Sequence, residues 1–139
     1  MPFIITWLLS LILFASVPIQ NIPEGIYPYY KEYLFIVQNE CPKVTVPRQL
    51  IIEFKELRNE EVGLCYLYVF KSKIEFDPLY WTQANDLMRK QLVFHELTHC
   101  ILETHHDDTY VNYMNSYLTY VPEEVLIEQV KQNARNNCN

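Results

Sequence analysis

The sequence predicts one small α+β domain, built from a short twisted mixed sheet, a long central helix and a C-terminal helix. The length of 139 residues suits a single hydrophobic core. Half of the residues are hydrophobic and 14% are aromatic, which supplies enough apolar volume to fill that core. The patterns run in the order helix, strands, helix, loop, helix, and this order indicates the α+β class.

The first predicted helix follows a linker over residues 20–28 that proline residues punctuate. Residues 29–40 carry apolar side chains at helical spacing and end before Pro42, which disfavours helical backbone in the residue that precedes it. The apolar positions of this helix are Tyr30, Tyr33, Leu34 and Val37.

Three strands are predicted next. Residues 50–54 form a short apolar run rich in β-branched side chains, which is typical of a buried strand. Residues 62–70 are predicted as a second strand, and residues 73–76 alternate in polarity as a third. Lys71 and Ser72 provide a turn between these two strands.

A long helix is predicted from residue 85 to residue 102, after the dipeptide Asp77-Pro78 ends the third strand. Its apolar residues cover a broad stripe, so we expect much of its circumference to be buried. Residues 103–120 are polar and aromatic without a steady period, which predicts a loop. A last helix begins at Pro122 and runs to about residue 132, with acidic residues near its positive end.

The N-terminal segment is predicted to direct the chain out of the cytosol. Residues 2–17 are apolar and uncharged, and the run is too short for a comfortable membrane span. We interpret residues 1–19 as a signal peptide. No basic residue precedes the run, and an uncleaved membrane anchor is the alternative. Residues 20–139 are then the functional domain.

Cysteine content and charge narrow the class of protein further. Four cysteines allow two disulfides in an exported chain, with three possible pairings, although Cys100 can also be a small buried hydrophobic residue. They are Cys41, Cys65, Cys100 and Cys138. The net charge is −6 and the 11 Lys and Arg residues are scattered, so no nucleic-acid partner is expected. We expect a secreted or extracytoplasmic monomer that contacts a membrane only through its N-terminal segment.

The segment His95-Glu96-Leu97-Thr98-His99 carries the clearest chemical signal. His95 and His99 are four residues apart, so on a helix both rings project toward one point, as two ligands of one zinc ion require. Glu96 is offset by about 100° around the helix, which suits a general base for the attacking water better than a direct ligand. Chance produces HExxH on the order of once in a hundred such chains, so two ordinary surface histidines are the simpler alternative.

The residues that follow favour the metal, because all four histidines of the chain lie between positions 95 and 106. The pattern resembles the metzincin clan of zinc peptidases, in particular small matrixin-like members, whose motif is HExxHxxGxxH followed by a turn that contains Met. His95, Glu96 and His99 match this motif. Leu102 occupies its glycine position, where the family's chain turns sharply out of the helix.

The resemblance leaves two positions for the third ligand. Strict spacing makes His105 the ligand, whereas a one-residue insertion puts Glu103 at the turn and His106 on the metal. We prefer His106, because the segment is similar to compact relatives in which the third His directly precedes an acid. In this sequence that acid is Asp107, which can orient a ligand imidazole or can be a solvated loop acid.

The resemblance also implies roles for the loop beyond the third ligand. Residues 112–117 look like the family's Met-turn, with Met114 beneath the imidazoles, and a Met that fills a core gap is the alternative. An edge strand within residues 62–76 is expected to pair with the substrate. Candidates for lining the pocket or for stabilising an oxyanion are Tyr113, Tyr117 and Tyr120.

These features predict an endopeptidase with one catalytic Zn²⁺, with Glu96 as the base and a peptide or protein as the substrate. Two alternatives stay open. In a gluzincin-type peptidase, Glu123 or Glu124 on the last helix completes the metal site. In a non-catalytic secreted zinc-binding module the same histidines hold a structural ion, but such a site has no use for Glu96.

Overall fold

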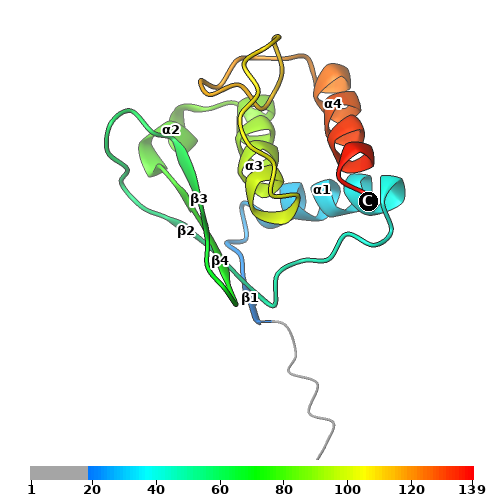
Figure 1. Ribbon diagram of the computed structural model, residues 1–139. Helices are drawn as coiled ribbons and strands as arrows, with labels where there is room; N and C mark the ends of the chain where they lie inside the picture. Colours follow the sequence, from blue (N-terminus) through cyan, green and yellow to red (C-terminus); the bar gives the residue numbers. More distant parts are fainter. Residues whose placement is uncertain (1–18) are drawn as a thin grey trace, which may run out of the picture.

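The computed structural model describes residues 19–139, which form a four-stranded mixed sheet and four helices (Figure 1). This architecture confirms the predicted small α+β domain. The predicted leader lies outside the described residues, apart from Ile19. The elements in chain order are β1 (Ile19–Asn21), α1 (Tyr27–Glu40), β2 (Gln49–Phe54), β3 (Gly63–Leu67), β4 (Ser72–Phe76), α2 (Pro78–Gln83), α3 (Asp86–Ile101) and α4 (Glu123–Asn136).

The sheet has the strand order β1-β2-β4-β3, with β1, β2 and β4 parallel to one another and β3 antiparallel to β4. Alternate residues of the two central strands are buried, as the two-residue period of a strand requires. These residues are Leu50 and Ile52 in β2, and Ile74 and Phe76 in β4. Strand β3 lies at one edge of the sheet, next to the helix that carries the HExxH motif.

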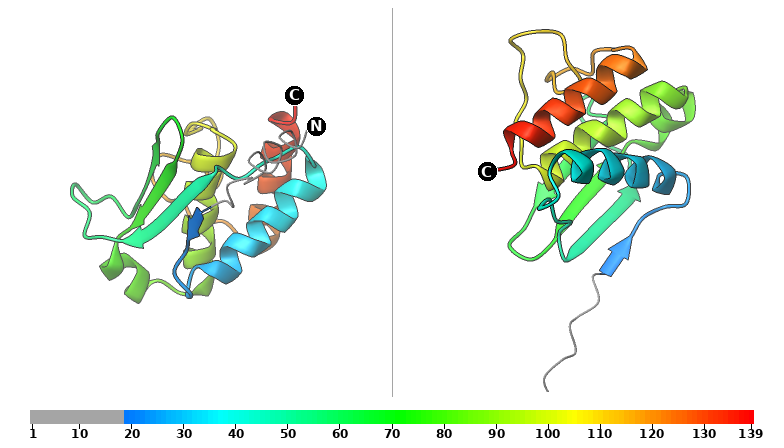
Figure 2. Two further views of the ribbon diagram at one scale, coloured as in Figure 1. Left: turned by 90° about the horizontal axis from the view of Figure 1, so that it is seen from below. Right: turned by 90° about the vertical axis from the view of Figure 1, so that its right-hand side faces the viewer.

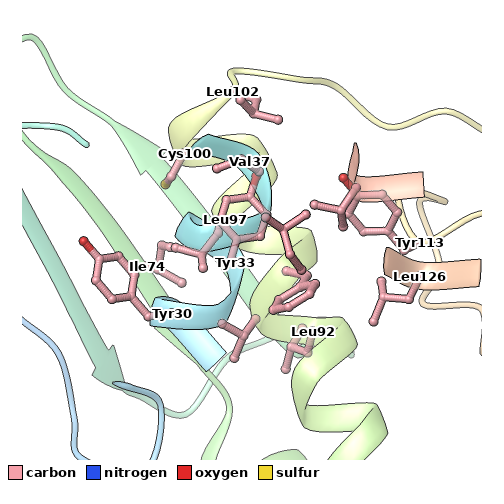
Figure 3. Packing of buried hydrophobic residues seen from close by; sticks show 14 of the residues in the cluster. Tyr30, Tyr33, Val37, Ile74, Leu92, Leu97, Cys100, Leu102, Tyr113 and Leu126 are labelled. Atoms are coloured by element: carbon pink, nitrogen blue, oxygen red, sulfur yellow. The ribbon is translucent and has the colours of Figure 1, made fainter. Parts of the chain in front are cut away.

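The three long helices cover one face of the sheet (Figure 2). Helix α3 packs against β3 and β4, while α1 and α4 pack against α3 and against each other. Figure 3 shows the buried side chains on both sides of α3, with Ile74 toward the sheet and Leu126 toward α4. Helix α3 begins where predicted, because the Asn85 side chain caps it by accepting the amide of Met88 (2.9 Å).

Two disulfides cross-link the fold and select one of the three possible pairings. Cys41–Cys138 links the end of α1 to the end of α4, and Cys65–Cys100 links β3 to α3. Cys100 is therefore buried and oxidised, so its interpretation as an unpaired hydrophobic residue is wrong. Two disulfides in one small domain indicate an oxidising, extracellular environment. No helix in the described part of the chain combines the length and apolar character of a membrane span.

The sequence prediction differs from the structure at several boundaries. Strand β3 ends at Leu67 rather than at residue 70, since the amide of Tyr68 donates to the carbonyl of Lys71 (2.9 Å) and closes a turn. Strand β1 and helix α2 were not predicted, because three and six residues are too few to show a period. Helix α4 runs four residues beyond the predicted end, because the buried side chains of Val130 and Ala134 pack its last turns into the core.

Candidate metal centre

Three histidine rings from α3 and the loop after it meet with their Nε2 atoms together. Nε2 of His95 lies 3.1 Å from that of His99 and 3.2 Å from that of His106. Two nitrogen ligands at about 2.0–2.1 Å from a tetrahedral zinc ion lie roughly 3.3 Å apart, which is close to both distances. Among residues 19–139, this is the one group of at least three His, Cys, Asp or Glu side chains whose ligand atoms are close enough to share an ion.

The hydrogen bonds of the other ring nitrogens define which tautomer is present. Nδ1 of His95 donates to the carbonyl of Tyr113, and Nδ1 of His99 donates to the carbonyl of Thr104, both at 2.6 Å. A carbonyl only accepts, so both Nδ1 atoms carry the proton and both Nε2 atoms present lone pairs in the neutral ring. Two lone pairs 3.1 Å apart do not hydrogen-bond to each other. They fit a shared cation.

Burial keeps these two rings neutral. It lowers the pKa of His95 to about 4, although the carbonyl of Tyr113 opposes this shift. Burial also lowers the pKa of His99, and the neighbouring His106 and His105 add to the effect. Neutral imidazole is the form that ligates a metal, so the site is prepared for an ion without first losing protons.

The chain leaves α3 through Glu103, which adopts the left-handed conformation with φ 53°. Leu102, at the glycine position of the metzincin motif, stays right-handed as the C-cap with φ −92°. The turn thus lies one residue later than the glycine of the metzincin motif, as expected for the one-residue insertion that puts Glu103 at the turn. His106 consequently reaches the other two rings, whereas His105, which is exposed like His106, lies outside the cluster.

Two buried asparagines hold the loop that carries the third histidine. The side-chain amides of Asn112 and Asn115 both donate to the carbonyl of Asp107, at 2.9 and 2.8 Å. From α4, the side chain of Gln129 accepts the amide of Tyr113 at 3.0 Å. This network positions the backbone carbonyl that accepts the Nδ1 proton of the first histidine.

Asp107 makes hydrogen bonds within the loop, whereas the side chain of Met114 is buried in the core. The carboxylate of Asp107 accepts the amide and hydroxyl of Thr109, at 3.0 and 2.5 Å, so it acts as a loop acid and does not orient an imidazole. Met114 is buried in the hydrophobic core, and its carbonyl accepts the amide of Asp107 at 3.0 Å. The orienting role predicted for Asp107 is instead performed by backbone carbonyls.

Of the three candidate tyrosines, Tyr117 lines the cleft above the histidines. Tyr113 is buried, and its hydroxyl bonds to Thr98 (2.9 Å) and accepts from Asn133 (2.9 Å), so it is not available to a substrate. Tyr120 is exposed and lines a separate hollow. The Thr98 hydroxyl satisfies all its bonds within the core, since it also donates to the carbonyl of Phe94 (2.8 Å).

Glu96 is 4% exposed, and its Oε1 atom lies 4.0 Å from Nε2 of His95. Burial and the carboxylate of Glu61 raise its pKa to about 8, while a hydrogen bond from the backbone of Cys65 opposes the shift. A metal cation held by the three neutral histidines would favour the carboxylate, which is the form that a base needs. A Cβ atom added to Gly63 would lie 2.7 Å from Oε1 of Glu96, so β3 can pass this close only because residue 63 is glycine.

The histidines and Glu96 lie in a cleft of about 880 Å³ between the edge strand β3 and the loop after α3. Backbone strain is concentrated around it. Asn59, Glu60 and Glu103 have positive φ values of 58°, 62° and 53°, and all three line this cleft. They are the non-glycine residues with positive φ in the described chain, and such strain gathers at functional sites.

Several of these residues were not anticipated from the sequence. The close approach of Gly63 to Glu96 depends on a strand and a helix that are far apart in sequence. The carbonyl groups that hold the histidines carry no sequence signal. The asparagines on either side of Tyr113-Met114 were a visible signal, since buried amides of this kind usually fix a loop.

Known proteins add no further information about the chain. No family model matches it, and no curated protein or solved structure matches it either. The residues and the geometry of the cleft therefore carry the evidence for function.

Proposed function

We propose that the protein is a zinc-dependent endopeptidase of metzincin-like type, with His95, His99 and His106 as the metal ligands. The observation that carries the proposal is the pair of neutral rings whose Nε2 lone pairs lie 3.1 Å apart while their Nδ1 protons are held by carbonyls. Three imidazoles leave one position for water or substrate on a four-coordinate ion. Zinc suits this donor set and hydrolysis, because it is a Lewis acid that polarises a carbonyl and makes water more acidic.

Glu96 is the proposed general base. Its carboxyl is buried beside the three rings, near enough to take a proton from a water but outside the group of ligands. The Cys65–Cys100 disulfide fixes β3, which lines the cleft beside this carboxyl, to α3. After the attack, the protonated Glu96 can pass its proton to the leaving amine.

The substrate is proposed to be an extended peptide that pairs with β3. This strand is the edge of the sheet, and residues 62–65 line the cleft beside the histidines. An edge strand offers unpaired backbone groups, so a peptide can bind there as a further strand. Such pairing places the peptide backbone, rather than one particular side chain, next to Glu96.

The gluzincin-type alternative has less support. Glu123 forms an ion pair with Lys90 Nζ (2.5 Å), and neither Glu123 nor Glu124 lines the cleft. The proposed location is extracytoplasmic, either secreted or anchored by the N-terminal segment, since both disulfides need an oxidising compartment.

The test combines metal analysis with a substitution of the base. The purified chain should contain one zinc per molecule and should cleave quenched-fluorescent peptides. Glu96→Gln should keep the zinc and lower kcat by about 10²–10⁴-fold, because it removes only the proton acceptor. Glu56→Gln, on an exposed loop outside the cleft, is the matched control and should behave as the unsubstituted chain. A chain that binds no metal, or a Glu96→Gln variant with full activity, would exclude the proposal.

A further inference from the structure

The last residue of β3 and the turn to β4 expose four consecutive large apolar residues. Val69 is 89% exposed and Phe70 is 82% exposed, and Leu67 and Tyr68 are half exposed. This is the longest run of exposed large hydrophobic residues among residues 19–139. Folded domains seldom leave such a run in water, so the turn calls for an apolar partner.

The sheet register fixes where this turn lies. Ile19 pairs with Gln49 and Leu50 pairs with Ser72, so β1, β2 and β4 all begin at the end of the sheet where β3 stops. Figure 1 shows the start of β1 and the β3–β4 turn together at this lower end. The chain that enters β1 there comes directly from residues 2–17, which are apolar and uncharged.

Basic residues accompany the apolar turn. Lys71 Nζ lies 5.1 Å from the centre of the Tyr68 ring, and Lys71 and Arg48 line one hollow together with residues 67–70. Glu103 is the one acid that lines this hollow. Aromatic and aliphatic side chains beside Lys and Arg are the composition of surfaces that lie in the interface of an anionic bilayer.

The small size of the surface favours a bilayer over a protein. A stable protein interface needs about 800 Å² from each partner, whereas this surface consists of one turn of four apolar residues. Insertion of a turn into the headgroup region has no such requirement, because each apolar side chain that enters contributes separately.

We propose that this surface, residues 67–71 with Arg48, is a membrane-docking surface for an anionic bilayer. The described chain begins at this same end of the sheet, so an uncleaved N-terminal anchor and the docking surface would both face one membrane. This inference is independent of the proposed peptidase activity, because no metal ligand belongs to the surface.

The test measures the depth of the turn in vesicles, using the full chain. Trp7→Phe removes the tryptophan of the N-terminal segment, and a reporter is then introduced by Phe70→Trp or, as a matched control, by Tyr120→Trp. Tyr120 is also exposed (64%), and the segment before α4 that contains it lies at the opposite end of the domain (Figure 1). Vesicles contain brominated phosphatidylcholine and phosphatidylglycerol, and the constant emission of Trp81 is subtracted.

We expect the Phe70→Trp reporter to lose roughly half of its emission, as a side chain about 5–10 Å deep in the interface should, and the Tyr120→Trp reporter to lose little. The loss should be smaller in vesicles of phosphatidylcholine alone, since Lys71 and Arg48 then lack anionic partners. Equal quenching of both reporters would overturn the proposal. Amide-exchange protection of residues 67–71 that rises with protein concentration without vesicles would also overturn it, in favour of a second copy of the chain.

Discussion

At the scale of single residues, the two ring nitrogens of each buried histidine perform different tasks. In His95 and His99, Nδ1 donates to a backbone carbonyl and Nε2 faces the centre of the cluster. Because a carbonyl accepts hydrogen bonds and cannot donate them, the backbone, rather than an acidic side chain, fixes the tautomer of each ring. Of the two adjacent histidines in the loop, only His106 brings its Nε2 atom into this cluster.

This difference gives a direct test of the third ligand. We expect His106→Ala to lower zinc affinity by at least about 10²-fold, because it removes one of three ligands. His105→Ala should leave the affinity nearly unchanged, since that ring lies outside the cluster of ligand nitrogens. Competition with a chromogenic chelator measures both values. The opposite order would move the ligand to His105 and would require a different exit from α3.

Gly63 provides the second test at this scale. A Cβ atom there would meet Oε1 of Glu96 at 2.7 Å and Cδ1 of Leu92 at 2.9 Å. We therefore expect Gly63→Ala to displace Glu96 and to lower kcat by about 10²-fold while zinc is retained. Gly25→Ala is the control, because nothing lies within 4 Å of an added Cβ at that position. Quenched-peptide kinetics and metal analysis should separate the two variants. Equal activity of Gly63→Ala and Gly25→Ala would contradict this prediction, because Glu96 would then function in its displaced position.

At the scale of elements, the short helix α2 is anchored by Asp77. One carboxylate oxygen accepts the amides of Leu79 and Tyr80, both at 3.0 Å, and the other accepts the amide of Leu57 at 3.1 Å. The bonds from Tyr80 and Leu57 are the main cause of a lowered pKa for this carboxyl. Asp77 thus joins the loop before β3 to the connection between β4 and α3.

The lowered pKa of Asp77 predicts how stability changes with pH. The folded state binds the proton more weakly than the unfolded state, so this contribution is present above the ordinary Asp pKa of 3.8 and is lost as pH falls through the lower folded value. Urea unfolding should show a declining free energy of unfolding over this acidic range. The free energy of unfolding of the Asp77→Asn variant should decline less steeply. That of the Glu56→Gln variant, which changes an exposed acid, should follow the unsubstituted chain. Equal slopes for all three would contradict the linkage.

The elements also show what the sequence could predict. Periodicity and caps identified α1, α3 and β2 within about two residues, because each is long or apolar enough to show its period. The end of β3 was misplaced, since Tyr68 to Phe70 have a strand-like composition but are exposed in a turn. Spacing alone left His105 and His106 open, and only the resemblance favoured His106, because the choice depends on the left-handed backbone of Glu103.

At the scale of the whole molecule, the cleft lies between two parts of the fold that are cross-linked at one point. The sheet edge supplies β3 and α3 supplies two histidines, and the Cys65–Cys100 disulfide joins these elements beside His99. The loop after α3 closes the other side and is held by Gln129 of α4. The sheet edge, α3 and the loop after α3 therefore together determine the distance from the edge strand to the rings. None of the three contains the complete site.

The charge of this cleft is one-sided. Besides Glu96, four acidic residues line it and no Lys or Arg does. The four residues are Glu60, Glu61, Glu103 and Asp108. Clefts with charge of one sign raise the local concentration of oppositely charged substrates, and this effect falls as salt is added. If the cleft binds peptides, peptides with basic side chains should therefore be preferred.

We expect a quenched peptide with Lys on both sides of the cleaved bond to have a kcat/KM about 10-fold higher than the same peptide with Glu, mainly through KM. The ratio should shrink as the salt concentration rises, because the acids are mostly exposed and hence screened. Glu60→Gln combined with Glu103→Gln should lower the ratio, whereas Glu124→Gln combined with Glu128→Gln, on the surface of α4, should not. A ratio that is unaffected by salt and by both double substitutions would mean that contacts with individual side chains, rather than the field of the cleft, select the substrate.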